Sequence, residues 1–210
     1  EHTLDTSLID GNRPLKVIDL GACQGEFTNA LALLFPMAYA MLVEPNPTNF
    51  AKIVPHPAIQ RYGLCTRPVA GISNQQVDFI EDVDSPYNGT TKYGWFTNQV
   101  VHKLVTISLA DLLTDAPEGP LDILKVDVEG SEYDILLNTP PEVLQRFTQI
   151  TVEFHDFLDP TVRPQNAIVI ARMHSLGFEH VSKPINYMHG SDNYDTLFYK
   201  PQQINGSYSA

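Results

Sequence analysis

Apolar and polar positions along this chain alternate between the spacing of strands and the spacing of helices. The apolar run 15–20 is followed by a glycine-containing turn and then by apolar residues at helical spacing over 27–34. A second apolar run, 39–43, ends just before Asn46, which is suited to cap the short helix that follows. The first part of the chain therefore predicts the order strand, helix, strand, helix.

The pattern is less regular in the middle of the chain. Candidate strands occur at 59–64, 68–72 and 77–80, where short apolar runs are separated by turn-forming residues. Residues 85–101 are rich in Pro, Gly, Asn and Thr, yet they carry several aromatic side chains. We expect an irregular loop there, which either packs through its own side chains or contacts a substrate.

Strands and helices alternate again in the second half. The segment 105–113 reads as a strand end that passes through Ser108 into a helical turn. Short apolar runs predict further strands at 122–128 and 149–154, and Gly130 opens a helix between them. We therefore expect the polar residues that end these two strands to lie at the same edge of a sheet.

The C-terminal part predicts a helix followed by a pair of strands. Residues 164–176 form an amphipathic pattern that ends at Gly177. The apolar runs 178–182 and 196–200 are joined by a connection too short for a crossover helix, so we expect antiparallel pairing. We predict one α/β domain over residues 1–210, with a mainly parallel sheet of about seven strands, a C-terminal antiparallel hairpin and helices on both faces.

Composition limits the partners and the compartment. The 13 basic and 25 acidic residues give a net charge of -12, which argues against nucleic acid as a substrate. Cys23 and Cys65 have no paired spacing, so we expect a reducing, cytoplasmic compartment and no thiolate metal site. No apolar run reaches the roughly 20 residues of a spanning helix, so we expect no membrane insertion. No signal-type segment precedes the first strand, although Glu1 in place of Met is compatible with a removed upstream segment.

Charged residues interrupt the strand predicted at 122–128. Alternation places Lys125, Asp127 and Glu129 on one face of it. Charges at the end of a buried strand are costly unless they pair with each other or with a ligand. An internal Lys–Asp ion pair with a helix cap and a ligand site at the carboxyl edge of the sheet both explain this pattern.

The turn after the first strand favours a nucleoside that is uncharged or cationic. Gly21 and Gly25 allow a tight turn, but a dinucleotide fingerprint needs glycine at positions occupied by Cys23 and Glu26. The carboxylate of Glu26 would also repel a phosphate at the start of the helix. Glu44, at the end of the second strand, is placed to accept hydrogen bonds from ribose hydroxyls. The alternative is an ordinary strand–helix turn with a solvated glutamate.

Two sets of residues resemble known methyltransferases. Asp19, Gly21, Gly25 and Glu44 together resemble the class I S-adenosylmethionine methyltransferases. The stretch Leu124–Glu132, which reads LKVDVEGSE, resembles the signature of the FkbM methyltransferase family, and the preceding V-T-x-x-L-x-x-L-L segment at 105–113 also resembles that family. The resemblance extends over about residues 15–200 and is weakest over 59–101.

The resemblance implies a fold, a cofactor and a reaction. It implies a class I methyltransferase fold, S-adenosylmethionine as methyl donor, and O-methylation of a hydroxyl on a sugar or a small natural product. It also implies the residues that hold the cofactor. These are Asp19, Gly21, Ala22, Gly25 and Glu44, with Ala70 in the region 69–72 near the adenine and Asp127 beside the sulfonium.

The polar ends of the strands at 122–128 and 149–154 supply the catalytic candidates. We expect Asp127 beside the sulfonium, Glu153 or His155 as the acceptor of the hydroxyl proton, and Lys125 as an internal counter-charge. Asp127, Glu153 and His155 can alternatively hold a divalent metal ion that acidifies the hydroxyl, or His155 can be structural. Glu129 and Glu132 receive no assigned role. The polar loop 187–194 is either a substrate lid or a solvated hairpin.

Two other functions remain compatible with such a sheet. One is a nicotinamide-dependent oxidoreductase, against which the absence of glycine at positions 23 and 26 counts. The other is a catalytically silent nucleoside-binding domain that serves protein contacts.

Overall fold

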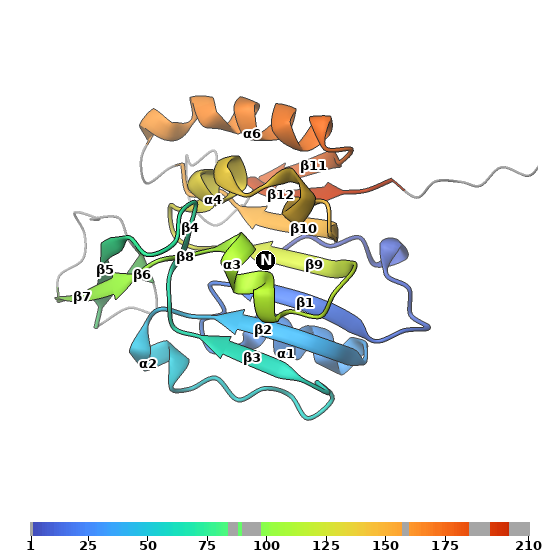
Figure 1. The fold of residues 1–210 in the computed structure, drawn as a ribbon, viewed down its shortest axis with the longest axis horizontal. Coiled ribbons are helices and arrows are strands. Elements are labelled where there is room, and N and C mark those ends of the chain that lie inside the picture. The colour runs from blue at the N-terminus through green and yellow to red at the C-terminus, as the bar shows by residue number, and fades with distance from the viewer. Residues whose placement is uncertain (1, 84–87, 90–97, 157–159, 185–193, 202–210) are drawn as a thin grey trace, which may run out of the picture.

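A seven-stranded sheet forms the centre of the computed structural model, which describes residues 2–83, 88–89, 98–156, 160–184 and 194–201 (Figure 1). The strand order is β11-β12-β10-β9-β1-β2-β3. Neighbours from β3 to β10 pair in parallel, and β12 is antiparallel to both β10 and β11. The strands are β1 (Leu15–Leu20), β2 (Met37–Val43), β3 (Tyr62–Cys65), β9 (Leu121–Val126), β10 (Phe147–Glu153), β11 (Glu179–Pro184) and β12 (Tyr194–Tyr199). The predicted mainly parallel sheet with a C-terminal antiparallel pair is confirmed.

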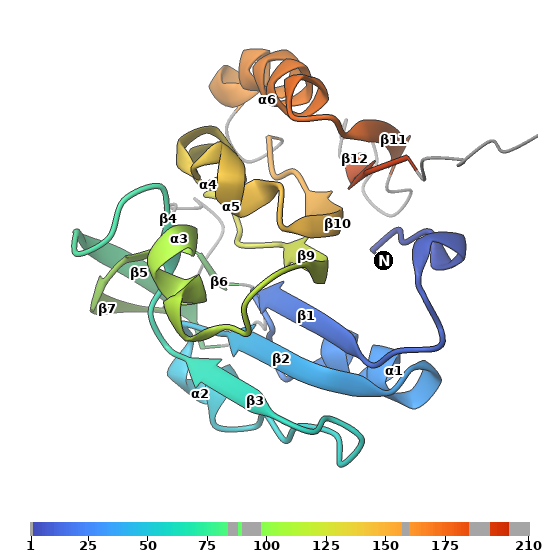
Figure 2. The ribbon, with the colours of Figure 1, turned by 45° about the vertical axis from the view of Figure 1, so that its right-hand side comes forward.

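Helices cover both faces of the sheet, as the sequence predicts (Figures 1 and 2). Helices α3 to α6 contribute side chains to one apolar core, and α1 contributes Leu31 and Ala32 to a second core on the opposite face. The α-helices are α1 (Glu26–Leu34), α2 (Pro47–Phe50), α3 (Leu109–Leu112), α4 (Glu132–Asn138), α5 (Pro141–Leu144) and α6 (Pro164–Ser175). Short 3₁₀ helices are η1 (Thr6–Leu8), η2 (Leu113–Asp115) and η3 (Pro160–Val162). In the described part of the chain, no helix has the length and apolar character to cross a membrane.

The helix starts follow local sequence signals. The Asn46 side chain accepts hydrogen bonds from the backbone of Thr48 and Asn49, and Pro47 occupies the first helical position of α2. Ser108 caps α3 by accepting from the backbone N–H of Asp111, which confirms the predicted passage from strand to helical turn. These caps place the ends of β2 and of the short strand β8 (Ile107–Ser108) where the sequence predicts them.

The strand β9 ends earlier than predicted. It stops at Val126, and the chain then turns through Glu129 with φ +55° and Gly130 with φ +112°. The Glu132 carboxylate holds this turn by accepting hydrogen bonds from the backbone N–H groups of Val128 and Gly130, at 3.2 and 3.0 Å. The alternation that assigns Glu129 to one strand face therefore does not apply, because Glu129 lies in a turn.

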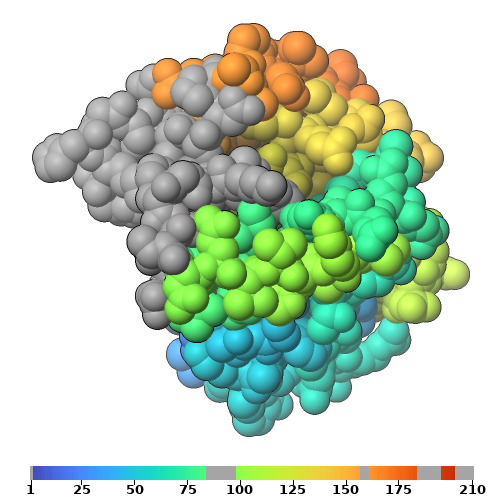
Figure 3. Space-filling view, turned by 90° about the vertical axis from the view of Figure 1, so that its left-hand side faces the viewer, coloured from blue at the N-terminus to red at the C-terminus, as the bar shows by residue number. Residues whose placement is uncertain are grey.

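Two smaller sheets occupy the least readable part of the sequence. Strands β5 (Gln76–Asp82), β6 (Asn88–Gly89) and β7 (Gln99–Val105) form one of them, and β4 (Val69–Ala70) pairs with β8 (Ile107–Ser108) in the other. The predicted irregular loop 85–101 is thus wrong where β6 and the start of β7 pair with β5, because such long-range pairing leaves no local signal. Residues near 100, in yellow-green, lie across the face seen in Figure 3. The lid predicted at 187–194 lies outside the described residues, except for Tyr194 at the start of β12.

Gly21 is a backbone position that the fold cannot vary. Its φ is +76°, and a Cβ there would lie 1.7 Å from the backbone oxygen of Asp127. Gly119 offers a matched control, because its φ is +78° and nothing lies within 4 Å of a Cβ. We expect Gly119→Ala to lower the free energy of unfolding by about 1–2 kcal/mol, the cost of the left-handed conformation. Gly21→Ala should cost clearly more in urea unfolding, and equal losses would contradict this packing.

Candidate functional site

A cavity of about 720 Å³ opens at the carboxyl ends of the central strands. It lies where β1 has β2 on one side and β9 on the other, the switch point at which open α/β sheets bind ligands. The ends of these strands and the three turns after them supply much of its wall, and β5 adds an aromatic ring. The lining residues from these elements are Gly21, Ala22, Cys23, Gln24, Val43, Glu44, Pro45, Lys125, Asp127, Val128, Glu129, Ser131 and Phe79.

The turn after β1 brings backbone against the cavity. The N–H groups of Gly21 and Ala22 donate to the carbonyl of Val43 at 3.0 and 2.9 Å, so the turn is fixed to the end of β2. Gly25, with φ +90°, is the N-cap of α1, and it is not among the described residues that line the cavity. Of the predicted cofactor residues here, Gly21 and Ala22 line the cavity, and Gly25 shapes the turn.

Glu44 is a buried carboxyl group whose two oxygens are both held by backbone. It accepts hydrogen bonds from the N–H of Cys23 and from the N–H of Asn46, each at 2.8 Å. Burial raises the pKa of Glu44 to about 7, although these two backbone bonds act in the opposite direction. Each carboxylate oxygen can accept a further bond, so Glu44 retains acceptor capacity toward a ligand in the cavity.

Lys125 is the cation that joins β1 to β9. Its ammonium group is buried, donates to the Gly21 carbonyl at 2.6 Å, and lies 3.2 Å from Asp127 Oδ2 and 3.4 Å from Asp19 Oδ1. Burial alone would lower the pKa of Lys125, but the charges of Asp127 and Asp19 raise it above its usual value. Lys125 is therefore charged at neutral pH, and the predicted internal counter-charge is seen in these contacts.

The two aspartates that face Lys125 have different surroundings. Asp19 is fully buried, accepts from the Thr28 hydroxyl at 2.7 Å, and is absent from the described lining of the cavity. The structure thus places Asp19 beneath the turn, where it fixes the geometry of Lys125. Asp127 lines the cavity, and although burial favours its neutral form, Lys125 and His2 hold the pKa of Asp127 well below its usual value. Asp127 is a permanent carboxylate.

His155 is held in a cage of carboxylates. Its Nδ1 lies 2.8 Å from Glu132 Oε1, and its Nε2 lies 3.4 Å from Glu129 Oε2 and 3.8 Å from Asp127 Oδ1. Burial would lower the pKa of His155, but Glu132 and Glu129 raise it well above its usual value. A histidine with a raised pKa holds its proton more tightly, so the charges around His155 make it a weaker candidate for proton acceptor.

Glu129 has the opposite behaviour to Asp127, although both line the cavity. Burial raises the pKa of Glu129 to about 7, and the neighbouring charge of Asp127 adds to the rise while His155 opposes it. The pKa values of these two carboxyl groups in one cavity therefore differ widely, and such a difference is typical of functional sites. Glu129 received no role from the sequence because its turn conformation cannot be read there.

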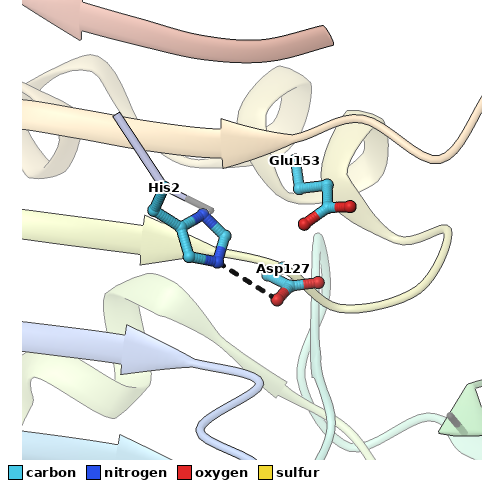
Figure 4. A group of neighbouring side chains, drawn as sticks. All are labelled: His2, Asp127 and Glu153. Carbon is cyan, nitrogen blue, oxygen red and sulfur yellow. Dashed lines mark ion pairs between the residues drawn. The ribbon is translucent and has the colours of Figure 1, made fainter. Parts of the chain in front are cut away.

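The N-terminal segment brings a further histidine into the cavity. His2 Nε2 lies 3.3 Å from Asp127 Oδ2, and the His2 ring meets Phe27 edge-on with centroids 5.5 Å apart. Figure 4 shows His2, Asp127 and Glu153 pointing toward one another from the N-terminus, the end of β9 and the end of β10. Hydrogen bonds between Asp5 and Gln149 hold the segment on β10. Sequence reasoning missed His2 because no motif surrounds it.

The predicted metal trio is not one group in the described residues. Asp127 belongs to two groups of closely spaced ligand atoms, one with His2 and Glu153 and one with Glu129 and His155. His155 approaches Asp127 Oδ1, whereas His2 approaches Oδ2. The combination of Asp127, Glu153 and His155 is not one of these two groups among the described residues, and it stays a prediction.

The region predicted to contact adenine borders the cavity through the neighbours of Ala70. Ala70 lies in β4 but is absent from the described lining of the cavity. Its neighbours Pro68 and Val69 line the cavity together with Phe79, a residue that the sequence did not single out. The region 69–72 thus reaches the cavity through Val69, and the ring of Phe79 adds a flat apolar surface beside it.

Comparison with known proteins identifies relatives of this fold. A family model described as the methyltransferase FkbM domain matches residues 19–180. A search of curated protein sequences found no match.

Solved structures resemble the chain at low identity. WbdD, crystallised with the kinase inhibitor LY294002, has a TM-score of 0.52 at 12% identity, and the match covers 93% of this chain and 39% of that one. An rRNA methylase from Streptococcus thermophilus has a TM-score of 0.51 at 12% identity, covering 94% and 92%. The METTL16 methyltransferase domain has a TM-score of 0.51 at 12% identity, covering 93% and 64%. At such identity the likeness is one of fold alone.

Lys125→Met tests the buried ion pairs. We expect it to lower the free energy of unfolding at pH 7 by about 3–5 kcal/mol, because Asp127 and Asp19 lose their counter-charge. The depressed pKa of Asp127 stabilises the fold above the unfolded value of about 3.9, and this contribution is lost as pH falls. The difference between mutant and wild type should therefore shrink below about pH 4.

Lys103→Met is the matched control for this measurement. Lys103 forms an ion pair with Asp78 on the surface, where both side chains are largely exposed. Its loss should cost about 1 kcal/mol or less in urea unfolding. If both variants lose stability equally, the buried ion pairs do not have the importance assigned to them.

Proposed function

Because this chain belongs to the FkbM family of methyltransferases, we propose that it transfers a methyl group to a hydroxyl oxygen of a sugar or another small molecule. Methyl transfer and S-adenosylmethionine as the donor follow from the family. The hydroxyl acceptor is the part that the site geometry supports. Family membership argues against the nicotinamide oxidoreductase that the sheet type alone allowed.

The cavity suits S-adenosylmethionine in its shape and in its charge. Gly21 lines the cavity, and because it has no Cβ its turn packs directly against the Asp127 backbone. Glu44 offers acceptor capacity for ribose hydroxyls, and Val69 and Phe79 offer an apolar surface for adenine. We assign Gly21, Ala22 and Glu44 to cofactor binding, with Asp19 and Gly25 shaping the turn. When bound, the cofactor supplies a methyl group on a cationic sulfur.

The proposal depends on two neighbouring carboxylates, the ionised Asp127 and the partly exposed Glu153. Asp127 stays ionised against Lys125 and can therefore attract the sulfonium without taking up a proton. Glu153 ends β10, and its carboxylate lies within 4.8 Å of the ligand atoms of Asp127 and His2. We assign Glu153 to accept the hydroxyl proton, which can then leave toward solvent. Holding the reactants in line contributes about 7–11 kcal/mol, more than the proton transfer does.

Electrostatics favours a small hydroxyl acceptor over nucleic acid. The chain carries a net charge of -12, and acidic groups surround the reacting end of the cavity. A phosphate-rich ligand would meet repulsion there. The solved structures of similar fold include an rRNA methylase. Its RNA substrate is a property of that protein and is not carried over to this chain.

Methyl transfer from labelled S-adenosylmethionine to panels of glycosides, small alcohols and RNA tests the proposal. Transfer to a hydroxyl of a small molecule is the expected result. Transfer to RNA alone would overturn it, and no transfer to any acceptor would favour the catalytically silent domain.

Glu44→Gln should weaken binding of S-adenosylhomocysteine, measured by calorimetry, by about 1.5–3 kcal/mol, the value of a hydrogen bond to a charged group. Since the pKa of Glu44 is about 7, the wild-type affinity should rise as pH increases through 7, where the carboxylate forms. The mutant should lose the part of this dependence that comes from Glu44. Glu142→Gln, at the start of α5, is the control and should bind as the wild type does. An unchanged affinity in Glu44→Gln would remove Glu44 from the cofactor site.

Glu153→Gln should lower kcat by roughly 100- to 10,000-fold, the contribution of a positioned base. Affinity for S-adenosylhomocysteine should stay unchanged, because Glu153 is not among the described residues that line the cavity. Glu179→Gln is the matched control, because the Glu179 carboxylate lies on the edge strand β11 and accepts a hydrogen bond from Tyr199 of β12. Equal kcat in Glu153→Gln and wild type would show that another group accepts the proton.

A further inference from the structure

We propose that Asp127, Glu129 and His155 bind a divalent metal ion in the wall of the cavity. The proposal starts from their separations. His155 Nε2 lies 3.4 Å from Glu129 Oε2 and 3.8 Å from Asp127 Oδ1, and one ligand atom of each residue lies within 4.8 Å of the others. These are ion-pair distances. Ligands that each lie about 2.1 Å from one ion are themselves about 3–3.5 Å apart.

A buried carboxylate orients the imidazole toward this point. Glu132 Oε1 lies 2.8 Å from His155 Nδ1, which leaves Nε2 directed at Asp127 and Glu129. Histidines that bind metals commonly donate their other ring N–H to a carboxylate in this way. Glu132 is fully buried, and its second oxygen has no hydrogen-bond partner among the described residues. Such a group is costly in a site that serves packing alone.

Glu129 has an unfavourable backbone conformation at this position. A non-glycine residue with φ +55° is uncommon, and such strain is typical of functional sites. The turn that produces it is fixed by the bonds from Val128 and Gly130 to Glu132. The same carboxylate thus sets both the conformation at Glu129 and the orientation of His155.

The negative charges around His155 favour binding of a divalent cation. Asp127, Glu129 and Glu132 all face this one imidazole. A metal ion binds an imidazole nitrogen that carries no proton and a carboxyl group that is ionised, so protons compete with the metal for these ligands. Metal affinity should therefore rise with pH.

The alternative group of His2, Asp127 and Glu153 is less suited to a metal. His2 approaches Asp127 Oδ2, the oxygen that Lys125 Nζ contacts at 3.2 Å, so an ion there would lie beside a buried cation. His2 Nδ1 is buried without a hydrogen-bond partner among the described residues, so no carboxylate orients that ring. The Glu129 group has the orienting carboxylate that the His2 group lacks.

The position of the ion connects it to the acceptor. Asp127 and Glu129 line the cavity, so open coordination positions would face the space where an acceptor oxygen can bind. Two carboxylates and one imidazole suit Mn²⁺ or a chemically similar ion. This role at the acceptor rests on the proposed function, whereas metal binding does not.

Titration of the 210-residue chain with MnCl₂, followed by electron paramagnetic resonance and calorimetry without cofactor, tests the site. We expect one bound ion, tighter binding at pH 8 than at pH 6, and proton release on binding. Glu129→Gln and His155→Ala should abolish it. Glu132→Gln should weaken it by about 10- to 100-fold, because the imidazole loses its orienting partner.

His2→Ala and Glu153→Gln are the controls and should keep the affinity for Mn²⁺. Circular dichroism and binding of S-adenosylhomocysteine will show whether each variant is folded, and Glu129→Gln is conservative enough to serve if His155→Ala is not. No Mn²⁺ binding, or equal binding by Glu129→Gln and wild type, overturns the site. Loss in the controls with retention in Glu129→Gln would place the ion at His2 instead. Failure of methyl transfer with Mn²⁺ binding intact would count against the proposed function and leave the metal site standing.

Discussion

The buried ammonium group of Lys125 is the interaction on which the site depends. It contacts the Gly21 carbonyl, Asp19 and Asp127, and thereby joins the turn after β1 to the end of β9. Transfer of a charged group from water into the protein interior costs free energy, and only closely placed partners compensate for it. These contacts are therefore constrained to a narrow geometry. The cavity lies between those two turns, and its shape follows from this ion pair as much as from the sheet.

The same cation separates the behaviour of the acidic groups around it. Asp127 lies against Lys125 and stays ionised, whereas Glu129 and Glu44 are buried with weaker compensation and have pKa values of about 7. One cavity therefore holds a permanent anion and two carboxyl groups that respond to pH near neutrality. Such a division suits a site that must attract a cation at one point and exchange protons at another.

The structure could be predicted from the sequence where neighbouring residues determine it. The order of strands and helices follows from apolar periodicity, and caps such as Asn46 and Ser108 are set by neighbouring residues. Prediction failed where pairing is long-range, as in β5 and β7, or where the backbone leaves the regular conformation, as at Glu129. In these places no short stretch of sequence contains the partner that determines the structure.

The sequence by itself determined the family, the α/β fold and a charged edge that holds Lys125, Asp127 and the end of β10, because each leaves a local signature. The tertiary structure decided which charges meet. It placed Asp19 beneath the turn and paired His155 with Glu129 and Glu132. It also brought His2 beside Asp127, which lies 125 positions away in the sequence. The physical reason is that pairing between charges depends on distances of a few ångströms, which register, turns and burial set only after the chain has folded.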